Sequence, residues 1–280
     1  MSPLNLFRLV LLAALWGGSF LFMRIVAPVL GAVPTAFLRV LLGALGLWAV
    51  VRLLRMPLRF DGKLGAAMGL GALNSGLPFL LFAAAATVLP SGYSAILNAT
   101  TPLMAALLGL AAFGERLGRL KLLGLSLGLA GVAACLVATA CYAAAGFLTR
   151  RWITQRGGLD SRLVALGSQL GAVALLLPLA AGQQLMQPIA WATVPPTVWA
   201  ALLALGLLCT AWAYVLYFRL IAEVGPVKAM TVTFLIPVFG VLWGVLCLGE
   251  TVTLAHAAGG SLIAGALWCV LRPQPAARQD

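Results

Sequence analysis

Residues 122–149 read LLGLSLGLAGVAACLVATACYAAAGFLT, a run of 28 residues without a charged side chain. Similar uncharged runs recur along the chain, each close to the ~20 residues that a helix needs to cross a bilayer. Strands of a membrane barrel would instead alternate apolar and polar residues over about 10 positions. The sequence therefore predicts an all-α integral membrane protein that lies in a lipid bilayer.

The composition excludes a soluble globule. Of 280 residues, 63% are hydrophobic and 9% are charged, whereas soluble domains carry about 25% charged residues. The net charge of +12 comes from short basic clusters between the apolar runs, which is typical of cytoplasmic loops and not of a nucleic-acid surface. We therefore expect no nucleic-acid partner. The five cysteines form no C-x-x-C pair, so we also expect no metal and no cofactor.

The placement of basic residues predicts how many times the chain crosses the membrane. The run 122–149 exceeds one crossing but falls short of the ~40 residues that two crossings need. Ten spans put the basic connecting segments in the cytoplasm, whereas nine would put every basic residue after Arg150 outside. We therefore expect ten spans in a cell (inner) membrane, with both termini cytoplasmic and either a very short connection or missing residues near Val137 and Ala138. The expected spans are 7–27, 34–54, 64–86, 92–113, 120–137, 138–153, 162–181, 197–221, 226–248 and 254–271.

The chain contains an internal repeat. The tripeptide at 248–250 matches that at 113–115 with an offset of 135, and the same offset pairs Pro102 with Pro237 and Gly124 with Gly259. The division predicts two units, 1–137 and 138–280, with five spans each. An odd number of spans inserts the two units in opposite orientations, and inverted repeats are common in transporters.

Several short motifs resemble one family. They are Leu15-Trp16-Gly17-Gly18-Ser19-Phe20, Phe37-Leu38-Arg39, Pro102 with Gly114-Glu115-Arg116, and Pro237 with Leu248-Gly249-Glu250. In this order the motifs resemble the EamA-type proteins of the drug/metabolite transporter superfamily, and among these the YddG-type exporters of aromatic amino acids. The resemblance implies ten helices around a central cavity, cytoplasmic termini and alternating access. The sequence departs from the family pattern at the short connection and at Tyr142-Ala143, which matches Trp16-Gly17 weakly.

Charged residues inside spans are rare here and therefore informative. Arg24 lies near the outer end of its span, where its guanidinium can reach the interface. Arg39 lies about two turns into the second span, where it either bonds backbone carbonyls or meets a substrate carboxylate. No carboxylate lies in the middle of a span, which disfavours the export of organic cations.

Polar and aromatic side chains form stripes at helical spacing, several of them beside Pro78, Pro102 or Pro237. Such stripes either join helices by hydrogen bonds or line a cavity. Gly65 and Gly69 have the spacing of a closely packed scaffold face. The expected substrate-binding residues are Trp16, Phe20, Arg39, Asn74, Phe79, Asn98, Thr101, Tyr142, Tyr214, Tyr217 and Thr233.

The sequence therefore predicts a transporter and not an enzyme. The expected substrates are amino acids and related small zwitterionic metabolites, which would leave the cell through a largely neutral, aromatic-lined cavity. Two fused repeats could form a complete pathway, so we expect a functional monomer. The alternatives are a multidrug exporter and a nucleotide-sugar or sugar-phosphate exchanger, although Arg39 alone is little positive charge for a phosphate.

Overall fold

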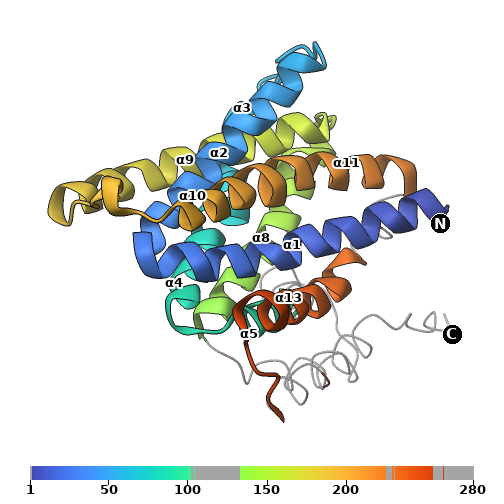
Figure 1. Cartoon of the computed structure of the whole chain (residues 1–280). Coiled ribbons are helices and arrows are strands. Elements are labelled where there is room, and N and C mark those ends of the chain that lie inside the picture. Colours follow the sequence, from blue (N-terminus) through green and yellow to red (C-terminus); the bar gives the residue numbers. More distant parts are fainter. Residues whose placement is uncertain are drawn as a thin grey trace, which may run out of the picture.

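The computed structural model describes residues 2–101, 104, 133–224, 229, 231–254 and 261, and this part of the chain is helical without strands (Figure 1). The first two helices meet at Gly31, whose φ of 85° suits a residue without a side chain. The elements are α1 (Pro3–Leu30), α2 (Ala32–Leu53), α3 (Leu64–Gly71), η1 (Ala72–Gly76), α4 (Leu77–Val88), α5 (Ser91–Asn98), α8 (Ala133–Trp152), η2 (Thr154–Arg156), α9 (Ser161–Met186), η3 (Trp191–Thr193), α10 (Pro196–Leu203), η4 (Ala204–Trp212), α11 (Ala213–Val224) and α13 (Val232–Leu248).

Five helical segments among the described residues are long and apolar enough to cross a membrane. They are α1, α2, the continuous helix α3–η1–α4, α9, and the helix that runs through α10, η4 and α11. These segments correspond to the first, second, third, seventh and eighth expected spans. The expected spans at 120–137 and 254–271 lie mostly outside the described residues, so the total of ten stays a prediction.

The connection expected near Val137 and Ala138 does not lie there. Both residues belong to α8, which runs without a break from Ala133 to Trp152. Neither glycine nor proline occurs between 133 and 145, so nothing in the local sequence ends a helix at this point. The expected position of the connection was wrong, whereas the division into units 1–137 and 138–280 stays a prediction.

The helix expected over 92–113 is interrupted early. α5 ends at Asn98, and a turn follows. Pro102 has no N–H that could bond to the Asn98 carbonyl, and the Thr101 hydroxyl donates to that carbonyl at 2.7 Å instead. The missing N–H of the proline agrees with the turn at Ala99 and Thr100, and most of the expected span beyond Thr101 lies outside the described residues.

α1 and α13 lie side by side and run in the same direction (Figure 1). Leu9, early in α1, shares a core cluster with Val232, early in α13. Further along, a Cβ at Gly17 would meet the backbone of Gly240 at 2.9 Å. Two helices can run parallel in a membrane only if an odd number of crossings lies between them.

α2 and α9 pack against each other in opposite directions. Gly43, in the middle of α2, faces Gln169, while Val51 near the end of α2 clusters with Leu163 near the start of α9. This antiparallel pair and the parallel pair α1 and α13 are the largest contacts between the N-terminal and the C-terminal parts of the chain.

Glycines bring α9 close to α3. A Cβ at Gly71 would collide with the Ser168 carbonyl, and one at Gly171 with the Met68 carbonyl. Of the two glycines expected on a scaffold face, Gly69 would place a Cβ 3.6 Å from the Trp152 ring of α8, whereas a Cβ at Gly65 would meet nothing within 4 Å among the described residues. Spacing identifies a face of a helix, but it does not say where another helix crosses that face.

The two ends of the bundle differ in charge. At one end, Arg8 near the start of α1 meets Glu223 near the end of α11. At the opposite end, Gly31 lies beside Gln183, and the segments around them line a pocket of about 400 Å³. The residues that line this pocket are Val29, Leu30, Gly31, Gln183, Gln187, Pro188, Ile189, Ala190, Thr193 and Val194, and none of them is charged.

Candidate functional site

Arg39 lies inside the bundle and is only 4% exposed. Its Nε donates to Thr210 Oγ1 at 3.2 Å, and its Nη1 donates to Met23 Sδ at 3.4 Å. Its Cζ lies 3.5 Å from the centre of the Phe79 ring, a close cation–π contact. The hydrogen bonds of Arg39 therefore go to side chains and not to the backbone carbonyls that were one expectation.

No carboxylate in the described part of the chain pairs with Arg39. An unpaired arginine at the centre of a membrane helix costs about 3 kcal/mol on insertion scales. A charged residue in this position is usually functional. The group that pairs best with a guanidinium is a carboxylate or a phosphate. The surroundings of Arg39 thus favour an anion-binding role.

One group of aromatic side chains joins α1 to α11. The Trp16 ring lies 5.2 Å from the Tyr217 ring and 6.4 Å from the Tyr214 ring, measured between centroids. Tyr214 in turn stacks on Phe218 at 5.9 Å. Three of the expected binding residues, one from the N-terminal part and two from the C-terminal part of the chain, therefore lie together.

A second aromatic group joins α1, α4 and α8. Phe20 packs edge-on against Phe82 at 5.3 Å, and Phe82 stacks on Tyr142 at 6.4 Å. Phe79, whose ring lies under the Arg39 guanidinium, belongs to the same core cluster as Phe20 and Phe82, and Trp16 and Tyr142 pack against that cluster. Phe79 therefore connects Arg39 to the second aromatic group, and Trp16 connects this group to Tyr214 and Tyr217.

Two hydrogen bonds link the two halves reciprocally. Arg39 of α2 donates to Thr210 in η4, and Gln169 of α9 donates through Nε2 to Ser75 Oγ in η1 at 2.9 Å. Both acceptors lie in π-helical segments, which occur frequently at functional sites in other proteins. All four side chains are buried.

Asn74 extends this polar cluster towards the aromatic side chains. Its Nδ2 donates to the Tyr214 hydroxyl at 3.4 Å. Asn74 belongs to the π-helical segment η1, and Tyr214 is the second residue of α11, just after η4. The role of Asn74 in substrate binding stays a prediction.

Three of the expected binding residues, Asn98, Thr101 and Thr233, lie at or just after the end of α5 and in α13, which contribute no other residue to the cluster. The Thr101 hydroxyl donates to the Asn98 carbonyl, and the Asn98 side chain is half-buried. Thr233 lies half-buried in the first turn of α13. Their assignment to a binding site stays a prediction.

Three residues of the cluster were missing from the expected binding residues, namely Ser75, Gln169 and Thr210. The internal repeat carries a signal for two of them, because the offset of 135 pairs Ser75 with Thr210 and also Gly71 with Gly206. Gln169 has no such signal, since a single amide in an apolar helix resembles any other interhelical hydrogen-bonding residue.

Arg24 has a structural role in this conformation. Its Nη1 donates to the carbonyls of Ala86 and Thr87 at 2.8 and 3.0 Å, at the end of α4. A cation at a helix C-terminus is favourable because the last carbonyls lack intrahelical partners. The expectation that this guanidinium reaches the end of its span agrees with that position.

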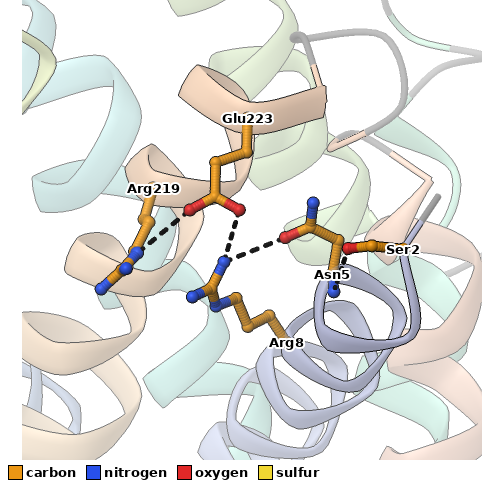
Figure 2. Close-up of polar contacts among 5 residues, drawn as sticks. All are labelled: Ser2, Asn5, Arg8, Arg219 and Glu223. Atoms are coloured by element: carbon orange, nitrogen blue, oxygen red, sulfur yellow. Dashed lines mark hydrogen bonds and ion pairs between the residues drawn. The ribbon is translucent and has the colours of Figure 1, made fainter.

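At the charged end of the bundle, Glu223 lies between two arginines (Figure 2). It accepts from Arg8 Nη1 at 2.5 Å and from Arg219 Nε at 3.2 Å. The hydrogen bond from Arg219, together with the charge of Arg8, holds the pKa of the Glu223 carboxyl below its usual range. Arg8 also bonds to Asn5 Oδ1 at 3.0 Å, so the ion pair ties the start of α1 to the end of α11.

A second carboxylate joins the halves at the other end. Glu250, just after α13, accepts from the backbone N–H of Ser91 at 2.8 Å and from its hydroxyl at 2.9 Å. The carboxylate therefore caps the start of α5, where backbone N–H groups lack partners. Gly244 leaves the space for it, because a Cβ there would collide with the Glu250 carboxylate.

The described residues contain no group of three or more His, Cys, Asp or Glu side chains placed to hold a metal ion. The expectation of no metal and no cofactor stays a prediction for the whole chain. The arrangement instead offers one buried cation, neutral hydrogen-bonding groups and aromatic walls, which suit the binding of a small organic molecule.

Comparison with known proteins agrees with this architecture. The EamA-like transporter family matches the chain twice, over residues 5–137 and 131–272. A comparison with curated protein sequences finds no significant match. Among 13 matching chains of solved structures, a crystal structure described only as that of a protein gives a TM-score of 0.58 at 20% identity, covering 96% of this chain and 95% of the other. That likeness concerns the fold alone.

The apolar helices and the duplicated family match define a multi-pass membrane protein built from two related units. The chain belongs to the EamA-like transporter family, within the drug/metabolite transporter superfamily. Members of this family are transporters and not enzymes.

Proposed function

We propose that this protein exports amino acids and related small zwitterionic metabolites through a central, largely neutral and aromatic-lined pathway. The observation that carries the proposal is Arg39, whose buried guanidinium has no carboxylate partner among the described residues. A substrate carboxylate would supply the missing acceptor. The surrounding rings would pack against an apolar or aromatic side chain.

The charges of the cluster favour this substrate class over the alternatives. Arg39 is the one charged residue among the buried polar residues of the described chain. It would repel an organic cation, and a single guanidinium matches one carboxylate better than the several charges of a nucleotide sugar. Neutral hydrogen-bonding groups, Thr210 beside Arg39 and Gln169 beside Gly43, suit a molecule without net charge.

The proposed mechanism is alternating access between the two halves. The parallel course of α1 and α13 supports ten spans, because nine spans would make these two helices antiparallel. Glu223 and Glu250 each connect elements of the two halves, at opposite ends of the bundle. We expect the contacts at one end to break when the pathway opens there, while those at the other end persist.

Counterflow tests the proposed function. The purified chain is reconstituted in liposomes that are loaded with unlabelled amino acid, and uptake of a labelled amino-acid panel is followed with and without a pH gradient. We expect exchange of neutral amino acids, including leucine and phenylalanine. Proton-driven uptake of organic cations without any amino-acid exchange would refute the proposal, and exchange of sugar phosphates alone would favour the exchanger alternative.

A further inference from the structure

Gln169 carries an unfilled hydrogen-bond acceptor in the middle of the bundle. The residue is 0% exposed, and its Nε2 donates to Ser75 Oγ. Its Oε1 has no hydrogen-bond partner among the described residues. Leaving a buried acceptor unpaired is unfavourable, and no donor among the described side chains pairs with this oxygen.

Arg39 has hydrogen-bond donors for which the described side chains supply few acceptors. Its Nε and Nη1 each donate one hydrogen bond, and the latter goes to the weak acceptor Met23 Sδ. Its Nη2 donates to no acceptor within the described chain. A guanidinium has five N–H donors, and the described side chains supply acceptors for two of the Arg39 nitrogens.

Gln169 Oε1 and Thr210, the acceptor of the Arg39 hydrogen bond, both lie beside Gly43, where α2 packs against α9 and η4. A Cβ at Gly43 would lie 2.7 Å from Thr210 Cγ2 and 3.5 Å from Gln169 Oε1. Thr210 is the same residue whose hydroxyl accepts from Arg39. Thr210 therefore contacts Arg39 through its hydroxyl and borders, through its methyl group, the space at Gly43 that Gln169 Oε1 also borders.

We propose that Gln169 and Arg39 together recognise the two charges of an α-amino acid. The guanidinium of Arg39 binds the carboxylate, and Oε1 of Gln169 accepts a hydrogen bond from the ammonium group. This inference rests on the proposed function and adds the residue that requires the amino group. Since both side chains are buried in this structure, the pathway must open beside Gly43 before a substrate reaches them.

Binding to the purified protein tests this assignment without relying on transport. Ligand-dependent thermal stabilisation in detergent is titrated with L-phenylalanine, with 3-phenylpropanoate, which lacks the amino group, and with 2-phenylethylamine, which lacks the carboxylate. A second series uses L-leucine, 4-methylpentanoate and 3-methylbutylamine. A hydrogen bond to a charged group contributes about 1.5–3 kcal/mol, so we expect each one-charge analogue to bind at least about 10-fold more weakly than its amino acid.

The decisive variant is Gln169→Leu, which removes the amide and keeps a similar volume. It should weaken binding of the amino acid about 10-fold and leave binding of the deaminated acid unchanged, so that the ratio between the two approaches one. Gln184→Leu, the same change on the same helix, is the matched control and should leave the ratio as in the wild type. Gln169→Asn keeps an amide on a shorter chain, and we expect it to give an intermediate ratio.

Each outcome decides between the two proposals. If the wild type exchanges amino acids but binds them no better than their deaminated analogues, the role of Gln169 is refuted and the proposed function stands. An equal weakening of both ligands by Gln169→Leu would also refute it, because that result indicates a merely structural amide. If neither amino acid is exchanged in the counterflow experiment, the proposed function fails, and this inference fails with it.

Discussion

At the scale of single residues, Arg39 is the side chain whose environment is hardest to explain by packing alone. Its charge is buried, it lies over the Phe79 ring, and its hydrogen bonds go to Thr210 and Met23. A purely structural arginine in a membrane usually pairs with an acid or with backbone carbonyls. Arg24, which bonds two carbonyls at the end of α4, shows the structural alternative in the same protein.

Substituting these two arginines separates the roles. Arg39→Met removes an uncompensated buried charge and keeps a long flexible chain, so we expect the Tm in detergent to stay the same or rise. Amino-acid counterflow should fall about 10-fold or more, because the carboxylate loses its partner. Arg24→Met, the control, should lower the Tm and retain counterflow. A lower Tm with full counterflow after Arg39→Met would assign Arg39 a structural role.

Gly71 gives a second prediction at this scale. Gly71→Ala places a methyl group against the Ser168 carbonyl of α9, and overpacking of this kind costs about 1–3 kcal/mol or more. Gly65→Ala on the same helix meets no described atom within 4 Å and should be neutral or stabilising by up to about 1 kcal/mol. Thermal unfolding of both variants measures the difference, and equal Tm values would contradict the close approach of α3 and α9.

At the scale of elements, the main feature is the pair of long helices that each contain a π-helical segment. The π-helical segments η1 and η4 each lie inside a long apolar helix. In η1, the Ser75 hydroxyl accepts from Gln169 of α9. In η4, the Thr210 hydroxyl accepts from Arg39 of α2. The Thr210 hydroxyl also donates to the Leu205 carbonyl at 2.9 Å, which satisfies a backbone group within the widened helix.

The ion pair between α1 and α11 predicts a pH dependence of stability. The pKa of Glu223 is lowered in the folded protein by Arg219 and Arg8, so the folded state holds this proton less tightly than the unfolded state. The stabilisation by Glu223 is therefore fully present above the ordinary glutamate pKa of about 4.3 and is lost as the pH falls through the lower folded value. Glu223→Gln removes this contribution at every pH.

The comparison of Tm between wild type and Glu223→Gln over a pH series measures this effect. We expect a constant difference between pH 8 and about 5, and a shrinking difference below about pH 4. A difference that grows on acidification would mean that the carboxylate is destabilised in the folded protein. The pair would then not hold α1 against α11.

At the scale of the whole molecule, the contacts describe two halves that interlock. α2 runs antiparallel to α9, while α1 runs parallel to α13. These directions are those expected if the two family repeats insert in opposite orientations with five spans each. The basic residues at the end of α2 and the start of α9 lie at one end of the bundle, and the uncharged pocket lies at the opposite end.

Cysteine labelling tests this topology. In a variant without native cysteines, single cysteines replace the exposed Gln155, between α8 and α9, and the exposed Gln187, after α9. With ten spans and a cytoplasmic N-terminus, a membrane-impermeant maleimide added to spheroplasts should label position 187 and reach position 155 only after permeabilisation. The reverse pattern would indicate nine spans and exclude inverted repeats.

The sequence alone determined that this protein is a helical membrane protein, and it located the long apolar spans and several aromatic residues that pack against one another in the core. Those features follow from the cost of exposing polar groups to lipid, which acts on every span separately. Only the tertiary structure brought Gln169 to Gly43 and Ser75, closed α3 against α9 at Gly71, and continued α8 through Val137. These features depend on where two helices cross, and that crossing is decided by packing between distant parts of the chain, about which a local sequence pattern carries no information.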